Sequence, residues 1–331
     1  MTGIKRSEVS MRKKRGFTID KLIELYEVSN QAEVKSEKTI TWYRYILTAF
    51  SRYAKQKWSS NDISIFNINN IRQYILDLRN RKSFEGHPYT RTQDKSVSSK
   101  TVQGHVRGLK AFSTWLHREG YTEENRLKNL KVPKAVSRVM EPLTAAEQEK
   151  VLATARNCQH EGIRNHAIVL TFLDTGERES ELADSSINNL NLEEGYMKVL
   201  GKGSKERVVP IGVYCQQTLR NYIDNVRPLP QNDNINNLFL TSAGKPISAN
   251  AIKLLFHRLA KVSGIERLHA HLCRHTFAVN YIMNGGDLSS LKEILGHTTF
   301  EMVNHYLHFT RSQITAQHRK YSPMDRLHLH K

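Results

Sequence analysis

The sequence predicts a mainly α-helical chain of two domains with one small β-sheet, and three observations lead to this prediction. From residue 17 to about residue 130, apolar residues recur at three- and four-residue steps, the period of an amphipathic helix. Residues 131–142 then hold two prolines and show no helical period, as expected of a linker. Further on, residues 196–200 and 207–210 flank a glycine-containing turn, as in a β-hairpin. A chain of 331 residues is long enough for two cores.

Residues 1–16 are rich in Lys and Arg and poor in apolar residues, so we expect a flexible basic arm. An unstructured start without a binding role is the alternative. The following region, 17–130, predicts a bundle of about four helices, with residues 83–97 as a loop between the last two long ones. Two apolar stripes are expected to form its core: Trp42, Tyr45, Ile46, Ala49, Phe50 and Tyr53 on one helix, and Val102, Val106, Leu109, Phe112 and Leu116 on another.

The net charge is +18, and most of it lies in the N-terminal part. Residues 1–130 hold 25 Lys and Arg against 13 Asp and Glu, a difference of +12, and the remainder holds 25 against 19, or +6. Such an excess favours a nucleic-acid partner over a merely solubilising charge. Basic residues of like sign on the predicted helices and hairpin are the candidates for contacts with the DNA backbone: Arg44, Lys100, Arg107, Lys110 and Lys205.

The three cysteines, Cys158, Cys215 and Cys273, are far apart and form no CxxC pair. A disulfide framework and a zinc ribbon are therefore not expected, and a reducing cytoplasm fits this usage. No apolar run approaches the length of a transmembrane helix, and the basic N-terminus is not followed by the apolar core of a signal peptide.

The C-terminal half, 143–310, begins with Thr144 and Glu147, whose spacing predicts a capping box and a helix start. Arg178 follows the turn-like pair Thr175-Gly176, so its guanidinium is expected near another helix start. A guanidinium matches two phosphate oxygens and keeps its charge at any working pH. Glu181, one helical turn later, predicts an ion pair that orients Arg178; a purely structural salt bridge is the alternative.

His271 and Arg274 are three residues apart, so they share a helix face. Arg274 supplies a second phosphate ligand, and His271 titrates near neutrality, as a general acid–base must. His271 and His275 also have the spacing of a zinc-binding pair. Leu272 stands where a metalloprotease helix requires Glu, so we expect no metal site.

His297 closes one helix, and Tyr306 follows nine residues later, after a fresh capping box at residues 298–301. The break between the two helices lets both side chains point to one site. Tyrosine, with an ordinary pKa of about 10, needs help to act as a nucleophile, and nearby arginines would favour its ionised form. Lys202 lies between two glycines at the predicted hairpin tip, where a surface lysine is the ordinary interpretation.

Six of these residues occur in an order that resembles the tyrosine recombinase (phage-integrase-like) family, most closely its Xer-like and transposon-resolvase-like members. They are Arg178, Lys202, His271, Arg274, His297 and Tyr306. The resemblance covers roughly residues 17–310 and implies a helical core-binding domain followed by a mixed α/β catalytic domain. It also implies a catalytic set with no cofactor: Arg178, Lys202, His271, Arg274, His297 and Tyr306. Glu177 departs from the apolar residue that is common in the family at that position.

The resemblance further implies cleavage through a 3′-phosphotyrosine, strand exchange through a Holliday junction, and a homo-oligomer: a dimer on one site and a tetramer in synapsis. Residues 311–331 are then expected to contact a neighbouring protomer, with a frayed terminus as the alternative. A type IB topoisomerase shares this chemistry, and a non-catalytic DNA-binding regulator shares the fold. The intact six-residue set argues against the regulator, and the compact Xer-like length and spacing argue against the topoisomerase.

Overall fold

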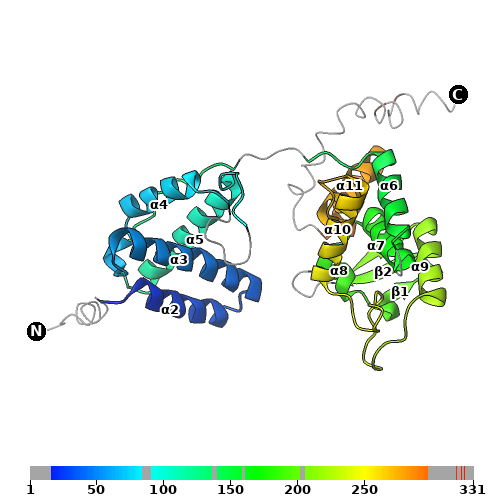
Figure 1. Ribbon diagram of the computed structural model, residues 1–331, viewed down its shortest axis with the longest axis horizontal. Coiled ribbons are helices and arrows are strands. Elements are labelled where there is room, and N and C mark those ends of the chain that lie inside the picture. Colours follow the sequence, from blue (N-terminus) through cyan, green and yellow to red (C-terminus); the bar gives the residue numbers. More distant parts are fainter. Residues whose placement is uncertain are drawn as a thin grey trace, which may run out of the picture. The chain divides into compact units, whose positions relative to one another are not determined.

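The computed structural model describes residues 16–83, 91–135, 140–158, 161–201 and 206–296, together with His318, Ser322 and Met324. It divides into two compact units, Met1–Arg138 and Val139–Lys331, called here the N-terminal and C-terminal units. The prediction of a mainly helical chain with a small sheet is confirmed (Figure 1). The bounds of the linker, 131–142, stay a prediction. In the part of the chain that is described, no helix combines the length and apolar character that a bilayer span requires.

The N-terminal unit is a helical bundle, with its helices shown in blue to cyan in Figure 1. Each helix begins at a residue whose side-chain oxygen accepts a backbone N–H of the first turn: Thr18, Ser36, Asn67 and Ser98. Such caps satisfy donors that the helix itself leaves unpaired. The described helices are α2 Ile19–Ala32, α3 Glu37–Trp58, α4 Ile68–Asn80 and α5 Ser99–Arg118, with a 3₁₀ turn at Ile63–Ile65.

The apolar stripe predicted on α5 is confirmed, because all five of its residues are buried. The stripe predicted on α3 is wrong in part, because Tyr45 is 63% exposed and Trp42 is 37% exposed. Helix α3 packs against both α2 and α5, and its buried face is turned around the helix from the predicted stripe: it keeps Ile46 and Phe50 and extends to Leu47, Ser51 and Ala54. A single period in the sequence does not show where two neighbours will lie.

The predicted loop at 83–97 is described on both sides of residues 84–90, which lie outside the described part. At its base, Lys82 and Ser96 form an isolated antiparallel bridge. The backbone N–H of Val97 also donates to the carbonyl of Arg81, at 3.1 Å. The two ends of the loop are therefore held together where α4 finishes and α5 is about to begin.

The C-terminal unit contains a three-stranded antiparallel sheet in the order β1-β2-β3. The hairpin of β2 Tyr196–Leu200 and β3 Glu206–Pro210 is confirmed, with Val199 opposite Arg207. Strand β1, Leu190–Asn191, was not predicted, because two residues are too short to show an alternating pattern. The remaining elements are α6 Ala145–Arg156, α7 Gly162–Thr175, α8 Glu179–Asp184, a 3₁₀ turn at Ile187–Asn189, α9 Val213–Asn225, α10 Ala249–Ser263, α11 Ala270–Met283 and α12 Leu288–Leu295.

Helix α7 runs through the centre of this unit and packs against α6, α9 and α11. Most of its side chains are buried, from Arg164 to Thr175. The predicted capping box of Thr144 and Glu147 is confirmed at the start of α6, with both reciprocal hydrogen bonds present. Because α7 is held on several sides, the turn that follows it is placed firmly against α11 and α12.

Candidate active site

Helix α7 ends at Gly176, whose φ of +63° lies in the left-handed region that favours glycine. A β-carbon at this position would lie 2.5 Å from the ring of Phe277 and 2.8 Å from a methyl group of Leu295. The turn can therefore approach α11 and the end of α12 only because it has no side chain here. Arg178 follows two residues later as the N-cap of α8, so the prediction that it lies at a helix start is confirmed.

Glu181 pairs with Arg178 as predicted. One carboxylate oxygen accepts the Arg178 guanidinium at 2.6 Å, and the other accepts its backbone N–H at 3.0 Å. The Glu181 side chain is only 4% exposed. Burial by itself raises the pKa of this carboxyl, but hydrogen bonds from Arg207 and Arg178 outweigh it and hold the pKa at about 2. Glu181 is therefore a permanent negative charge at neutral pH.

Arg274 lies on α11 and is buried. Its guanidinium donates to the carbonyl of Gly176 at 2.6 Å and to that of Leu295 at 2.8 Å. These two bonds join the turn after α7 to the end of α12. Arg178 and Arg274, far apart in the sequence, thus approach the same turn.

His271 precedes Arg274 by one helical turn and keeps an exposed edge. Partial desolvation of the ring lowers its pKa, and the positive charges of Arg274 and other nearby groups lower it further. The neutral ring, which can accept a proton, is therefore favoured at neutral pH. His275, the second member of the alternative zinc pair, directs its Nε2 to the carbonyl of Met140 at 2.6 Å.

Three successive carbonyls at the C-terminal end of α12 each accept a hydrogen bond from a different arginine. Arg207 donates to Ile294 at 2.7 Å, Arg274 to Leu295, and Arg178 to Gly296 at 3.4 Å. A helix C-terminus carries partial negative charge, so positive groups are stabilising there. We call Arg178, Arg207 and Arg274 the arginine cluster. The predicted helix end just before His297 is confirmed, because α12 finishes at Leu295 with Gly296 as its left-handed cap.

Arg207 was not among the predicted site residues. It lies on β3, on the same face as the buried Val209, and its side chain is 12% exposed. Its guanidinium holds both oxygens of Glu181, at 3.0 and 2.7 Å. An arginine at an inward position of a strand needs a buried carboxylate or several carbonyls, and that pattern could have drawn attention to it.

Glu177, the residue that departs from the family pattern, is fully buried beside the arginine cluster. Neither of its carboxyl oxygens has a hydrogen-bond partner among the residues that the structure describes. Burial, and then the charge of Glu181, raise its pKa to about 8, against the opposing effect of Arg207 and Arg274. The carboxyl is therefore protonated and neutral at pH 7.

The other predicted catalytic residues, Lys202, His297 and Tyr306, lie outside the described residues, as does Lys205. So do the capping box at 298–301, residues 1–15 of the basic arm, and all of the tail 311–331 except His318, Ser322 and Met324. The roles predicted for them stay predictions.

The candidate DNA-contacting residues of the N-terminal unit have different surroundings. Lys100 and Arg107 are exposed on α5 and, with Trp42 of α3, line a hollow of about 440 Å³. Arg44 is paired with Glu27 of α2. Lys110 donates to the carbonyls of Lys128 and Leu130, at 3.1 and 2.6 Å, and so ties the chain after α5 back to that helix. Among the members of this set that the structure describes, Lys100 and Arg107 are thus the two without an ion pair or hydrogen bond of this kind.

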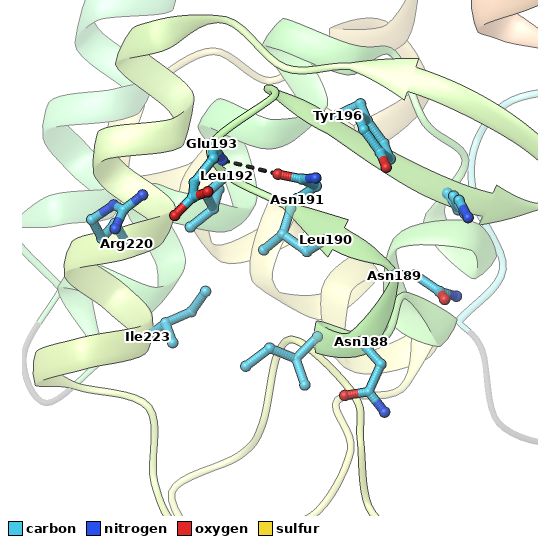
Figure 2. A pocket seen from close by; sticks show the side chains of 11 residues that line it. Asn188, Asn189, Leu190, Asn191, Leu192, Glu193, Tyr196, Arg220 and Ile223 are labelled. Atoms are coloured by element: carbon cyan, nitrogen blue, oxygen red, sulfur yellow. Dashed lines mark hydrogen bonds between the residues drawn. The ribbon is translucent and has the colours of Figure 1, made fainter.

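Figure 2 shows a second hollow, of about 520 Å³, on the C-terminal unit. It lies between β1, β2 and α9, and the backbone N–H of Glu193 donates to the side chain of Asn191 at its edge, at 3.1 Å. Its lining is mainly asparagine and aliphatic side chains, with Arg220 and Lys198, and it shares no residue with the arginine cluster. It therefore adds no group to the candidate site.

Comparison with known proteins points to one family. The model of the phage integrase family matches residues 141–313. Tyrosine recombinase XerD of Staphylococcus saprophyticus is 32% identical over 232 residues, which cover 70% of this chain and 79% of that protein. Tyrosine recombinase XerC of Bacillus subtilis is 29% identical over 238 residues, which cover 71% and 78%.

Solved structures show the same fold at lower identity. The integrase of transposon Tn1549 in complex with transposon right-end DNA aligns with a TM-score of 0.70 at 19% identity, covering 92% of this chain and all of that one. A lambda integrase dimer bound to a core site aligns with a TM-score of 0.68 at 18% identity, covering 92% and 81%. The match of the family model over residues 141–313 and the likeness to XerD show that the chain belongs to the phage integrase family of tyrosine recombinases.

Proposed function

We propose that this protein is a site-specific DNA recombinase that cuts and rejoins strands through a covalent link to Tyr306. The observation that carries the proposal is the convergence of Arg178 and Arg274 on one turn, with Glu181 orienting Arg178, in a chain of this family. Its relatives are named tyrosine recombinases. Two guanidinium groups suit the two non-bridging oxygens of a phosphodiester.

In the proposed reaction the Tyr306 hydroxyl attacks the scissile phosphorus, and a bond forms between the tyrosine oxygen and the 3′ phosphate. The bond to the 5′ oxygen breaks at the same time. His271 accepts the tyrosine proton, for which the lowered pKa of its ring is suited. Lys202 delivers a proton to the leaving 5′ oxygen, and His297 donates a hydrogen bond to a non-bridging oxygen. A 5′ hydroxyl of the partner strand then displaces the tyrosine.

Arg178 and Arg274 stabilise the charge that builds up on the phosphate in the transition state. The phosphotyrosine link keeps the energy of the broken bond, so we propose that the reaction needs no ATP. We also propose that it needs no metal ion. The reaction would take place in the cytoplasm, in keeping with three free cysteines.

The structural relatives include recombinases whose structures contain DNA sites: a lambda integrase dimer on a core site, and XerH on a palindromic difH substrate. For this chain we propose the same class of partner, a double-stranded recombination site bound by a dimer. Two such dimers would form a tetramer that holds the two sites together, and the sites would exchange strands through a Holliday junction. The basic residues of the N-terminal unit would hold the DNA backbone.

The experiment begins by selecting genomic DNA fragments that the protein binds and sequencing them. A bound site is then made with a nick next to the scissile phosphate, so that the released strand diffuses away and the covalent product accumulates. We expect the wild-type protein to form an adduct that resists denaturant, in the presence of EDTA. Tyr306→Phe removes only the hydroxyl, so it should bind the site with nearly unchanged affinity and form no adduct.

An adduct of normal yield with the Phe variant would refute the role of Tyr306. Binding without any wild-type adduct would favour a DNA-binding regulator. Relaxation of supercoiled DNA that lacks the selected site, at the same rate as DNA that contains it, would favour a topoisomerase.

A further inference from the structure

We infer that Arg207 is a positioning residue of this site: it neutralises Glu181 and so leaves the charge of Arg178 available to the DNA phosphate. This inference rests on the proposed function. It starts from the observation that two arginines, Arg178 and Arg207, share one carboxylate.

The first step concerns charge. Glu181 carries one negative charge and is only 4% exposed, so it requires a counter-ion close by. Arg207 binds both of its oxygens with a parallel fork, the strongest geometry that an arginine can offer a carboxylate. Arg178 contributes one guanidinium bond and its backbone N–H. The pair Arg207–Glu181 is therefore balanced by itself, and the charge of Arg178 is in excess.

The second step concerns exposure. The Arg178 side chain is 35% exposed, whereas that of Arg207 is 12% exposed. The Glu181 carboxylate thus has a largely buried partner, Arg207, and a partner that solvent can reach, Arg178. A phosphate can reach Arg178, while Arg207 has all three of its nitrogen atoms engaged by Glu181 and Ile294. Arg207 is therefore not a phosphate ligand; it acts through Glu181.

The third step concerns what happens without Arg207. Glu181 would keep Arg178 as its nearest positive group, and the guanidinium would be drawn towards the buried carboxylate rather than towards DNA. The end of α12 would also lose the bond to Ile294, whose carbonyl lies one residue before the carbonyl that Arg274 holds and two before the one that Arg178 holds. A displacement of about 1 Å in a catalytic group is enough to slow a reaction by roughly 100-fold.

Gly296 supports this arrangement. A β-carbon at that position would lie 3.1–3.2 Å from the Arg207 side chain, and the φ of Gly296 is +61°. The cap of α12 and the Arg207 side chain are thus packed against each other. Arg207 therefore also supports this cap, which directly precedes His297 in the sequence.

The test compares variants at position 207 by the rate of single-turnover cleavage on the nicked site, with protein in excess of DNA. Arg207→Gln keeps a polar side chain and removes the charge, and should cleave about 100-fold more slowly than wild type, with site affinity within about threefold. Arg207→Lys keeps the charge but not the fork, and should stay within roughly tenfold of wild type. Thermal unfolding of each variant checks that it is folded.

The second arm removes the charge that Arg207 neutralises. In Arg207→Gln/Glu181→Gln, no carboxylate is left to draw the Arg178 guanidinium inward, so cleavage should be at least about tenfold faster than in Arg207→Gln alone. Arg227 provides a matched control in the same unit, because it donates to the carbonyls of Leu238 and Asn237, at 3.1 and 2.7 Å, away from Glu181. Arg227→Gln should lower stability and leave the cleavage rate within about threefold.

Equal rates for Arg207→Gln and Arg207→Lys would overturn the counter-ion role, and so would a double variant no faster than Arg207→Gln. If wild-type protein itself formed no adduct, the proposed function would fail instead. The two failures are therefore distinguishable in one set of measurements.

Discussion

The two units use basic side chains in opposite ways. In the N-terminal unit, Arg107 and Lys100 are exposed on one helix face, and Arg44 makes only a surface ion pair, with its side chain 55% exposed. In the C-terminal unit, Arg274 is buried and Arg207 is only 12% exposed, and both are held by carbonyls or a carboxylate. Exposed charges attract a polyanion, are screened by salt and can replace one another. Held charges are fixed in direction before the substrate arrives, so each has its own role.

This comparison predicts its largest effect at Arg178. Arg178→Ala removes one preorganised charge from the developing transition state, which typically costs about 3–4 kcal/mol, or roughly a 10³-fold slower cleavage. Site binding should change far less, because the charges of the N-terminal unit remain. Single-turnover cleavage and binding are measured side by side. Cleavage within about tenfold of wild type would contradict the assignment of Arg178.

The next effect concerns stability at the buried carboxyl of Glu177. Its pKa is raised to about 8 in the folded protein, from 4.5 as the ordinary value. Between these two values the folded state holds a proton that the unfolded state has lost, so stability falls as pH rises. By pH 7 the free energy of unfolding should be about 3 kcal/mol lower than at a pH below both values.

Glu177→Leu should therefore be more stable than wild type at pH 7, and its stability should vary less between about pH 5 and 8. Denaturant unfolding at several pH values measures this. Glu194, which is exposed, offers the control: Glu194→Leu should leave the pH dependence unchanged. A wild-type stability that does not decline through this window would show that Glu177 has a partner when the whole chain folds.

The smallest effect is expected in the N-terminal unit. Lys100→Ala/Arg107→Ala should make the log–log dependence of DNA affinity on salt less steep by about 0.9 for each phosphate contact that is lost. The effect should be similar on specific and unrelated DNA, because backbone contacts carry no sequence information. Arg44→Ala is the comparison, since Arg44 already pairs with Glu27 and its loss should reduce the slope less. A larger change in this slope with Arg44→Ala than with the double variant would contradict the assignment of Lys100 and Arg107 as the main contacts to the DNA backbone.

The elements that follow from neighbouring residues agree with the sequence-based expectations. The helix start at Thr144, the hairpin of β2 and β3, and the Arg178–Glu181 pair all depend on groups that are close in the sequence. Such contacts form between side chains whose spacing is set by the helix or strand itself. The order of the six predicted catalytic residues likewise indicates the right family from the sequence alone.

Packing between distant segments accounts for the rest. Arg207 is 26 residues from Glu181, and Arg274 is 98 residues from Gly176, so no local pattern brings these groups together. The exposure of Tyr45 and Trp42 also depends on where α2 and α5 lie against α3. A helical period shows that one face is apolar, but which side of the helix is buried depends on its neighbours. For the same reason, the role of Arg207 becomes visible only when strand, helix end and carboxylate are packed together.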